Sequence, residues 1–237
     1  MKFHLSDPPL TVPPTGNKSN SDYRKSPYII QAACAGNIPT FRKLLEAGCK
    51  INEFGHICLS KKRKNSVLST VIGAAAYHGK NEMLKYLLAS PQLQKSYIEV
   101  GCSELQDIKP IKAGPLSHEY QGYTPLQLVV VSAFSDLETL QILLQQKANT
   151  KITERETGNN LYHLAAIHCT NFDVFQYIVK NVDLDLFERN KAGETLASLV
   201  KASDDKKRYQ LVEEIQNLRD RTKLEAAKLL EELMSAE

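Results

Sequence analysis

Histidine and cysteine occur as two close pairs, and these residue types could bind a metal ion or form a nucleophile with its base. His56 lies two residues before Cys58, and His168 directly precedes Cys169. A zinc site needs about four ligands, and neither pair has further ligands at a suitable spacing. Neighbouring side chains on a helix or turn also point away from each other, which argues against a Cys169 nucleophile activated by His168. The sequence therefore predicts no metal site and no catalytic cysteine.

Motifs of common enzymes are also missing from the sequence. It contains no G-x-x-x-x-G-K or G-x-G-x-x-G phosphate loop and no G-x-S-x-G nucleophile turn. Its carboxylates are scattered, and Glu154, Glu156, Asp183 and Asp185 are expected at solvated loop tips or helix ends. We therefore expect a protein that is not an enzyme, with no cofactor and no small-molecule substrate.

Four consecutive basic residues form the strongest charge feature, Lys61, Lys62, Arg63 and Lys64. The chain carries a formal charge of +3, from 30 Lys and Arg against 27 Asp and Glu, so it is near neutral outside this run. The run is interpreted as a solvated loop, a nuclear import signal or an anchor for an anionic surface such as nucleic acid or an acidic protein. Four charges supply only a few phosphate contacts, which predicts weak, salt-sensitive binding without base recognition.

Composition indicates a globular protein of a reducing compartment. The 237 residues are 42% hydrophobic and 24% charged, which is enough apolar content to bury a core. The first ten residues hold no apolar run typical of a secretory signal, and no stretch reaches the ~20 apolar residues of a membrane span. The five cysteines are odd in number and include no C-x-x-C pair. We therefore expect a cytoplasmic or nuclear location and no membrane partner.

Repeated segments in the sequence predict the helices that position the residues named above. Each segment holds a short helix rich in small or apolar residues, a turn, and a second helix with apolar residues at i, i+3 and i+4 spacing. In the first two segments Gly36 and Gly79 follow the first helix, where glycine lets the backbone adopt a left-handed conformation. The four segments are Ala32–Gly55, Ala75–Leu88, Gly122–Asn149 and Gly158–Ile178, and a degenerate fifth begins at Gly193.

The segments Ala32–Gly55 and Gly122–Leu128 carry the most specific signal, the latter reading Gly-Tyr-Thr-Pro-Leu-Gln-Leu. Over residues 26–200 the chain resembles the ankyrin-repeat family, with its G-x-T-P-L-H-x-A-A signature and period of ~33 residues. The resemblance implies an all-α solenoid of stacked helix pairs that binds other proteins on a concave face. Gln127 replaces the histidine of the signature, and His163 lacks the preceding threonine, so we expect incomplete hydrogen bonding where these helices begin.

The spacing of the repeats predicts the domain boundaries. The second-helix apolar pairs begin at positions 44, 87, 143 and 177, so the intervals are 43, 56 and 34 residues. The long intervals predict insertions at about 55–69 and 90–121, and an irregular turn within 132–136. Residues 1–25 are Pro-rich and are expected to be disordered, and the array is expected over residues 26–200. Residues 201–237 are predicted to form C-terminal capping helices.

The alignment of the repeated segments predicts which residues contact a partner. They lie at the ends of the first helices, at the loop tips and in the second insertion. They are Phe54, Tyr77, His78, Tyr120, Arg155, Ile167, His168 and Arg189. At the C-terminus, the stripe of Leu211, Ile215 and Leu218 is expected to cover the end of the array. A capping box at Thr222 predicts a second helix, which either caps the array or docks on a partner. Its docking residues are Leu224, Ala227, Leu230 and Met234.

These features favour a non-enzymatic adaptor or scaffold that binds one or more proteins through the concave face. One alternative is a permanent structural subunit of a large multiprotein assembly, for example a cytoskeletal complex. Another is a nuclear, nucleic-acid-associated factor that uses the Lys61–Lys64 run. Arrays of this kind recognise many unrelated proteins, so the resemblance does not identify the partner.

Overall fold

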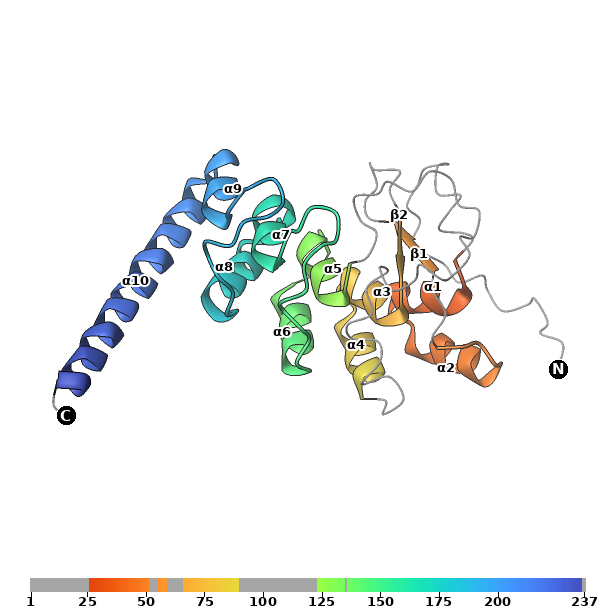
Figure 1. The fold of residues 1–237 in the computed structure, drawn as a ribbon. Helices are drawn as coiled ribbons and strands as arrows, with labels where there is room; N and C mark the ends of the chain where they lie inside the picture. The colour runs from red at the N-terminus through yellow and green to blue at the C-terminus, as the bar shows by residue number, and fades with distance from the viewer. Residues whose placement is uncertain (1–25, 52–54, 59–65, 90–122, 135, 236–237) are drawn as a thin grey trace. The chain divides into compact units, whose positions relative to one another are not determined.

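The computed structural model describes residues 26–51, 55–58, 66–89, 123–134 and 136–235 (Figure 1). The chain divides into two compact units, Met1–Asn149 and Thr150–Glu237. Within the described ranges there are ten α-helices and one two-stranded hairpin. The predicted helical character is therefore confirmed for these residues, and the hairpin is a departure from an all-α fold.

The first unit contains three helix pairs. They are α1 (Tyr28–Ala35) with α2 (Ile38–Glu46), α3 (Val71–Tyr77) with α4 (Asn81–Leu88), and α5 (Pro125–Val131) with α6 (Leu137–Gln145). Helix α3 packs between α1 and α5, and α4 packs against α6, so first and second helices form two rows (Figure 1). Gly36 and Gly79 follow α1 and α3 with φ of 71° and 59°, which confirms the predicted left-handed turns.

Small residues allow the close approach of α3 to both neighbours. Every residue of α3 is buried. A Cβ atom on Gly73 would lie 2.2 Å from Ser69 Oγ and 3.0 Å from a methyl carbon of Leu128 in α5, so a larger residue would displace these two side chains. The second helices bury apolar stripes that include Leu87 and Leu143, as predicted. In α2, however, the leucine pair at positions 44 and 45 is only half-buried.

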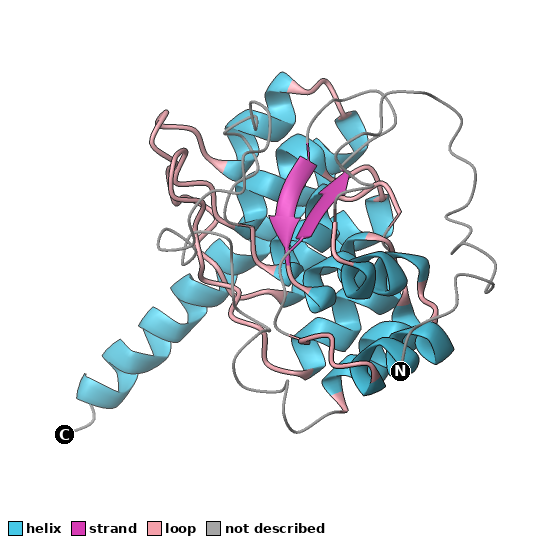
Figure 2. Ribbon diagram, turned by 90° about the vertical axis from the view of Figure 1, so that its right-hand side faces the viewer, coloured by secondary structure: helices cyan, strands magenta, loops and turns pink. Residues whose placement is uncertain are grey.

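A β-hairpin that the sequence did not predict precedes α3. Strands β1 (Gly55–Cys58) and β2 (Ser66–Ser69) pair antiparallel, with Gly55 opposite Ser69, and lie side by side in Figure 2. Strands of four residues are too short for an alternating apolar pattern to stand out. Several predictions fall outside the described residues: the 1–25 tail, the 90–121 insertion, Phe54, Tyr120 and the run Lys61–Lys64.

The second unit consists of α7 (Leu161–His168), α8 (Phe172–Asn181), α9 (Leu196–Ala202) and α10 (Lys206–Ser235). Helix α9 packs on α7, and α10 packs on α8 and α9. Leu211 and Ile215 of α10 are buried, as expected, but Leu218 is exposed, although Arg219 beside it is half-buried.

The predicted helix start at Thr222 is wrong, because α10 is continuous from Lys206 to Ser235. The hydroxyl of Thr222 donates a hydrogen bond to the carbonyl of Leu218 one turn earlier, so it bonds within the helix. No glycine or proline occurs between residues 206 and 235 to end the helix. The C-terminal region is therefore one long helix after α9.

Reciprocal hydrogen bonds cap α5 and α7, contrary to the expectation of incomplete bonding. In α5 the Gln127 amide N–H donates to the Thr124 hydroxyl at 3.3 Å, and the Thr124 amide N–H donates to Gln127 Oε1 at 2.8 Å. In α7 the His163 amide N–H donates to Asn160 Oδ1, and the Asn160 amide N–H donates to His163 Nδ1. Glutamine and asparagine thus complete the capping boxes in place of the signature residues.

Candidate interaction surface

An aromatic cluster in the first unit lies between the C-terminal end of α3 and the loop that follows α5. The rings of His78 and Phe134 are stacked, with centroids 5.6 Å apart and an angle of 28° between their planes. Both rings meet the Tyr77 ring edge-on, at centroid distances of 5.1 and 5.9 Å. Phe134 keeps 50% of its surface exposed, so the cluster presents an aromatic face to solvent.

Ser132 holds the loop in this position. Its backbone is extended, which ends α5 and confirms the predicted irregular turn within 132–136. The Ser132 hydroxyl donates to the carbonyl oxygen of Tyr77 and accepts a hydrogen bond from the Phe134 amide N–H at 2.9 Å. Through Ser132, the loop that carries Phe134 is therefore hydrogen-bonded to the end of α3.

Polar contacts join α4 to α6 beside this cluster. Asn81 Oδ1 accepts from the Thr139 hydroxyl at 2.7 Å, and Asn81 Nδ2 donates to Glu138 at 2.9 Å. Lys85 Nζ lies 2.8 Å from Glu138 and 3.0 Å from Glu82. The hydrogen bond from Lys85 lowers the pKa of Glu138 below its ordinary value. These contacts hold α6, which follows the loop that carries Phe134, against α4.

His78 is neutral at physiological pH. Among the described residues, no group forms a hydrogen bond with its buried Nε2 atom. Burial lowers the pKa of His78 to about 4, and the charge of Lys80 adds to this effect. The ring therefore contributes an uncharged aromatic surface beneath Phe134.

The low pKa of His78 predicts that acid destabilises the first unit. Between pH 6.5 and about 4 the unfolded state binds a proton that the folded state excludes, so the free energy of unfolding falls as pH falls through this window. The contribution is at most about 3 kcal/mol. We expect His78→Leu to lose less stability than the wild type between pH 7 and pH ~4.5 in urea unfolding. Equal losses in both proteins would contradict the buried, neutral state of His78.

In the second unit, the predicted contact residues lie at two places. Ile167 is exposed and His168 is half-buried at the end of α7. Arg155 and Arg189 are exposed on loops; the Arg189 guanidinium donates to the Gly193 carbonyl at 2.6 Å, and Lys191 Nζ donates to the Arg155 carbonyl at 2.6 Å. These bonds order the loops that present the two arginines.

Cys169 has the properties of a structural thiol. It is buried, and burial raises the pKa of its thiol above the ordinary value. Its Sγ atom donates to the carbonyl of Asn171 at 3.2 Å. A raised pKa disfavours the thiolate that nucleophilic attack requires, so the site offers no support for cysteine chemistry.

The expected exposure of Tyr77 is wrong, because its side chain has no exposed surface. The loop after α5 covers it, and sequence register alone does not reveal that loop's path. Phe134 was missed, although an aromatic residue among the extra residues at 132–136 was an available signal. On α10, Leu224 and Ala227 are exposed, whereas the side chains of Leu230 and Met234 lie outside the described residues.

Neither the described structure nor the comparison with known proteins indicates a metal site, a membrane span or a family. Within the described ranges, no group of three or more His, Cys, Asp or Glu could hold a metal ion. No helix in those same ranges is both long and apolar enough to cross a membrane. No protein-family model matches the sequence, and no curated protein matches it.

Proposed function

We propose that this chain is a non-enzymatic adaptor or scaffold built on an ankyrin-type array of helix pairs. It binds a partner protein through the first helices of the pairs and the turns that follow them. Three features support an ankyrin-type array: helix pairs in two rows, left-handed glycines after α1 and α3, and capping boxes at the starts of α5 and α7. In the family that the sequence resembles, the first helices and their turns form the concave face.

The half-exposed Phe134 is the observation that carries the proposal. It is held in place by Ser132 and stacked on an uncharged His78 ring. Aromatic residues are enriched in protein interfaces, and a side chain that is already ordered loses little entropy when a partner covers it. The cytoplasmic or nuclear location belongs to the same proposal, because Cys34, Cys49 and Cys169 are free thiols among the described residues.

The test is quantitative affinity purification with the full chain from its native cells. We expect Phe134→Ala to reduce the recovery of at least one specific partner by about tenfold or more, the loss typical of an interface anchor. Tyr28→Ala is the matched control, because Tyr28 is 66% exposed on α1 of the same unit. Undiminished recovery of every specific partner with Phe134→Ala would refute the proposed surface, provided that both variants match the wild type in thermal unfolding.

A further inference from the structure

Helix α10 is attached at both ends of α8 by arginine side chains. Arg208 of α10 donates a hydrogen bond to the carbonyl of Cys169, which precedes α8, and Arg219 donates to the carbonyl of Leu184, which follows it. Positions 208 and 219 are about 16 Å apart along the helix axis, and the ten residues of α8 span about 15 Å. The two arginines therefore hold α10 along the full length of α8.

The attachment at Arg208 combines several contacts. The Arg208 side chain is only 11% exposed, and its Nε atom lies 3.1 Å from Asp205 Oδ2. Its guanidinium carbon also lies 4.8 Å from the centre of the Phe175 ring in α8. On the next turns of α10, Leu211 and Ile215 are buried. Opening this end of α10 would break an ion pair, a hydrogen bond and a cation–π contact, and it would expose apolar surface.

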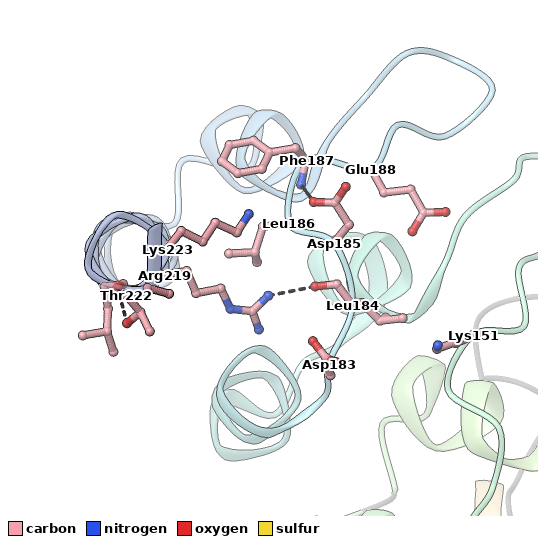
Figure 3. A pocket seen from close by; sticks show the side chains of 12 residues that line it. Lys151, Asp183, Leu184, Asp185, Leu186, Phe187, Glu188, Arg219, Thr222 and Lys223 are labelled. Atoms are coloured by element: carbon pink, nitrogen blue, oxygen red, sulfur yellow. Dashed lines mark hydrogen bonds between the residues drawn. The ribbon is translucent and has the colours of Figure 1, made fainter. Parts of the chain in front are cut away.

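The attachment at Arg219 depends on hydrogen bonds to uncharged oxygens. The Arg219 guanidinium donates to the Leu184 carbonyl at 2.8 Å and to the Tyr162 hydroxyl at 3.0 Å. The Tyr162 hydroxyl in turn donates to the carbonyl of Val182. Figure 3 shows Arg219 extending from α10 to Leu184. Arg219 is half-buried, and no described carboxylate forms an ion pair with it.

A groove beside this attachment separates the outer half of α10 from the loop that follows α8. It has a volume of about 860 Å³ and lies between residues 183–188 and residues 218–226 (Figure 3). Leu218 lines the groove and is 62% exposed, and every side chain from 220 to 228 is exposed. Among the described side chains of α10, Ile215 is therefore the last buried apolar one, and Arg219 is the last that forms a hydrogen bond with another element.

We propose that the Arg219 end of α10 detaches separately, while the Arg208 end stays bound. Detachment of the outer end breaks the hydrogen bonds of one half-buried side chain and returns its charge to water, where it is well solvated. Detachment of the inner end would in addition expose Leu211 and Ile215. The outer end therefore opens at the lower cost in free energy.

The opened state has a definite extent. Residues 216–235 of α10 leave the body of the second unit, and residues 206–215 keep their contacts. The groove then widens at Leu184 and Leu186, which line it. This conformational step is independent of the function proposed for the first unit, because none of these residues belongs to the aromatic cluster.

Hydrogen exchange with mass spectrometry on the full chain tests the separate opening. Arg219→Met removes the hydrogen-bond donors and keeps an unbranched side chain. We expect exchange in residues 216–222 to become about tenfold faster or more, and exchange in residues 206–214 to change little. Arg221→Met is the matched control, because Arg221 is exposed on the same helix and no described residue bonds to its side chain. It should leave both segments as in the wild type.

Tyr162→Phe provides a second variant of the same network. It removes only the hydroxyl that accepts from Arg219 and donates to Val182. We expect a smaller acceleration in residues 216–222 than with Arg219→Met. Adding Tyr162→Phe to Arg219→Met should have less effect than Tyr162→Phe has in the wild type, because both substitutions remove the same hydrogen bond.

Four results would overturn this inference. Unchanged exchange in residues 216–222 of Arg219→Met would show that packing alone holds this part of α10. Equal acceleration in residues 206–214 would show that α10 opens as a whole, and lost protection of α9 would show that the unit unfolds with it. The same acceleration in Arg221→Met would assign the effect to the charge of the helix rather than to the contact. None of these results changes with the outcome for Phe134→Ala.

Discussion

Replacing Tyr77 with alanine is expected to destabilise the first unit by about 3–5 kcal/mol, a large fraction of the stability of an ordinary domain. The Tyr77 ring has no exposed surface and packs edge-on against His78 and Phe134. Its removal leaves a cavity at the point where α3 meets the loop after α5. Urea unfolding followed by circular dichroism at constant pH measures the loss.

Phe134→Ala is the matched control, because it removes a ring from the same cluster that is half-exposed. It should cost about 1 kcal/mol or less. Similar costs for the two variants would contradict the burial of Tyr77. The comparison also decides which variant can report on partner binding, since a lost partner after Tyr77→Ala would reflect unfolding.

His163→Leu is expected to destabilise the second unit by about 3 kcal/mol, because three backbone groups in buried or part-buried hydrogen bonds lose their partner together. The His163 side chain is buried. Its Nδ1 atom accepts from the Asn160 amide N–H at 3.2 Å, and its Nε2 atom lies 3.1 and 3.0 Å from the carbonyl oxygens of Glu188 and Glu194. Since carbonyl oxygens only accept hydrogen bonds, Nε2 carries a proton and ties the start of α7 to the loop before α9.

Hydrogen exchange with mass spectrometry locates the effect of His163→Leu. We expect faster exchange in α7 and in residues 188–194, with little change in the first unit. Ile167→Ala, an exposed position on the same helix, should leave exchange close to wild type. Unchanged protection of α7 in His163→Leu would show that these hydrogen bonds contribute little to stability.

Local signals predicted the helix pairs, and contacts between distant segments account for most of what the sequence missed. Gly36 and Gly79 mark turns by their own backbone freedom, and the leucine spacing marks the buried stripes. The burial of Tyr77 depends on a loop more than fifty residues later in the chain. The hairpin depends on pairing between two strands that are too short to show a pattern.

The candidate sites were less predictable than the helices. The groove combines residues 183–188 with residues 218–226, and no sequence spacing relates these two segments. Leu218 continues the apolar stripe of Leu211 and Ile215, so sequence alone predicts it buried. Its exposure depends on how α10 lies against the rest of the second unit, which is a property of tertiary structure.

The unequal packing of α10 has a consequence for melting behaviour. With 30 residues the helix is about 45 Å long, and its described side chains from Asp220 to Lys228 are exposed. Helix without tertiary support is only marginally stable in water and frays from its end. Gradual heating should therefore lower the ellipticity at 222 nm in a sloping phase before the cooperative transition, as the outer turns unwind ahead of the globular body.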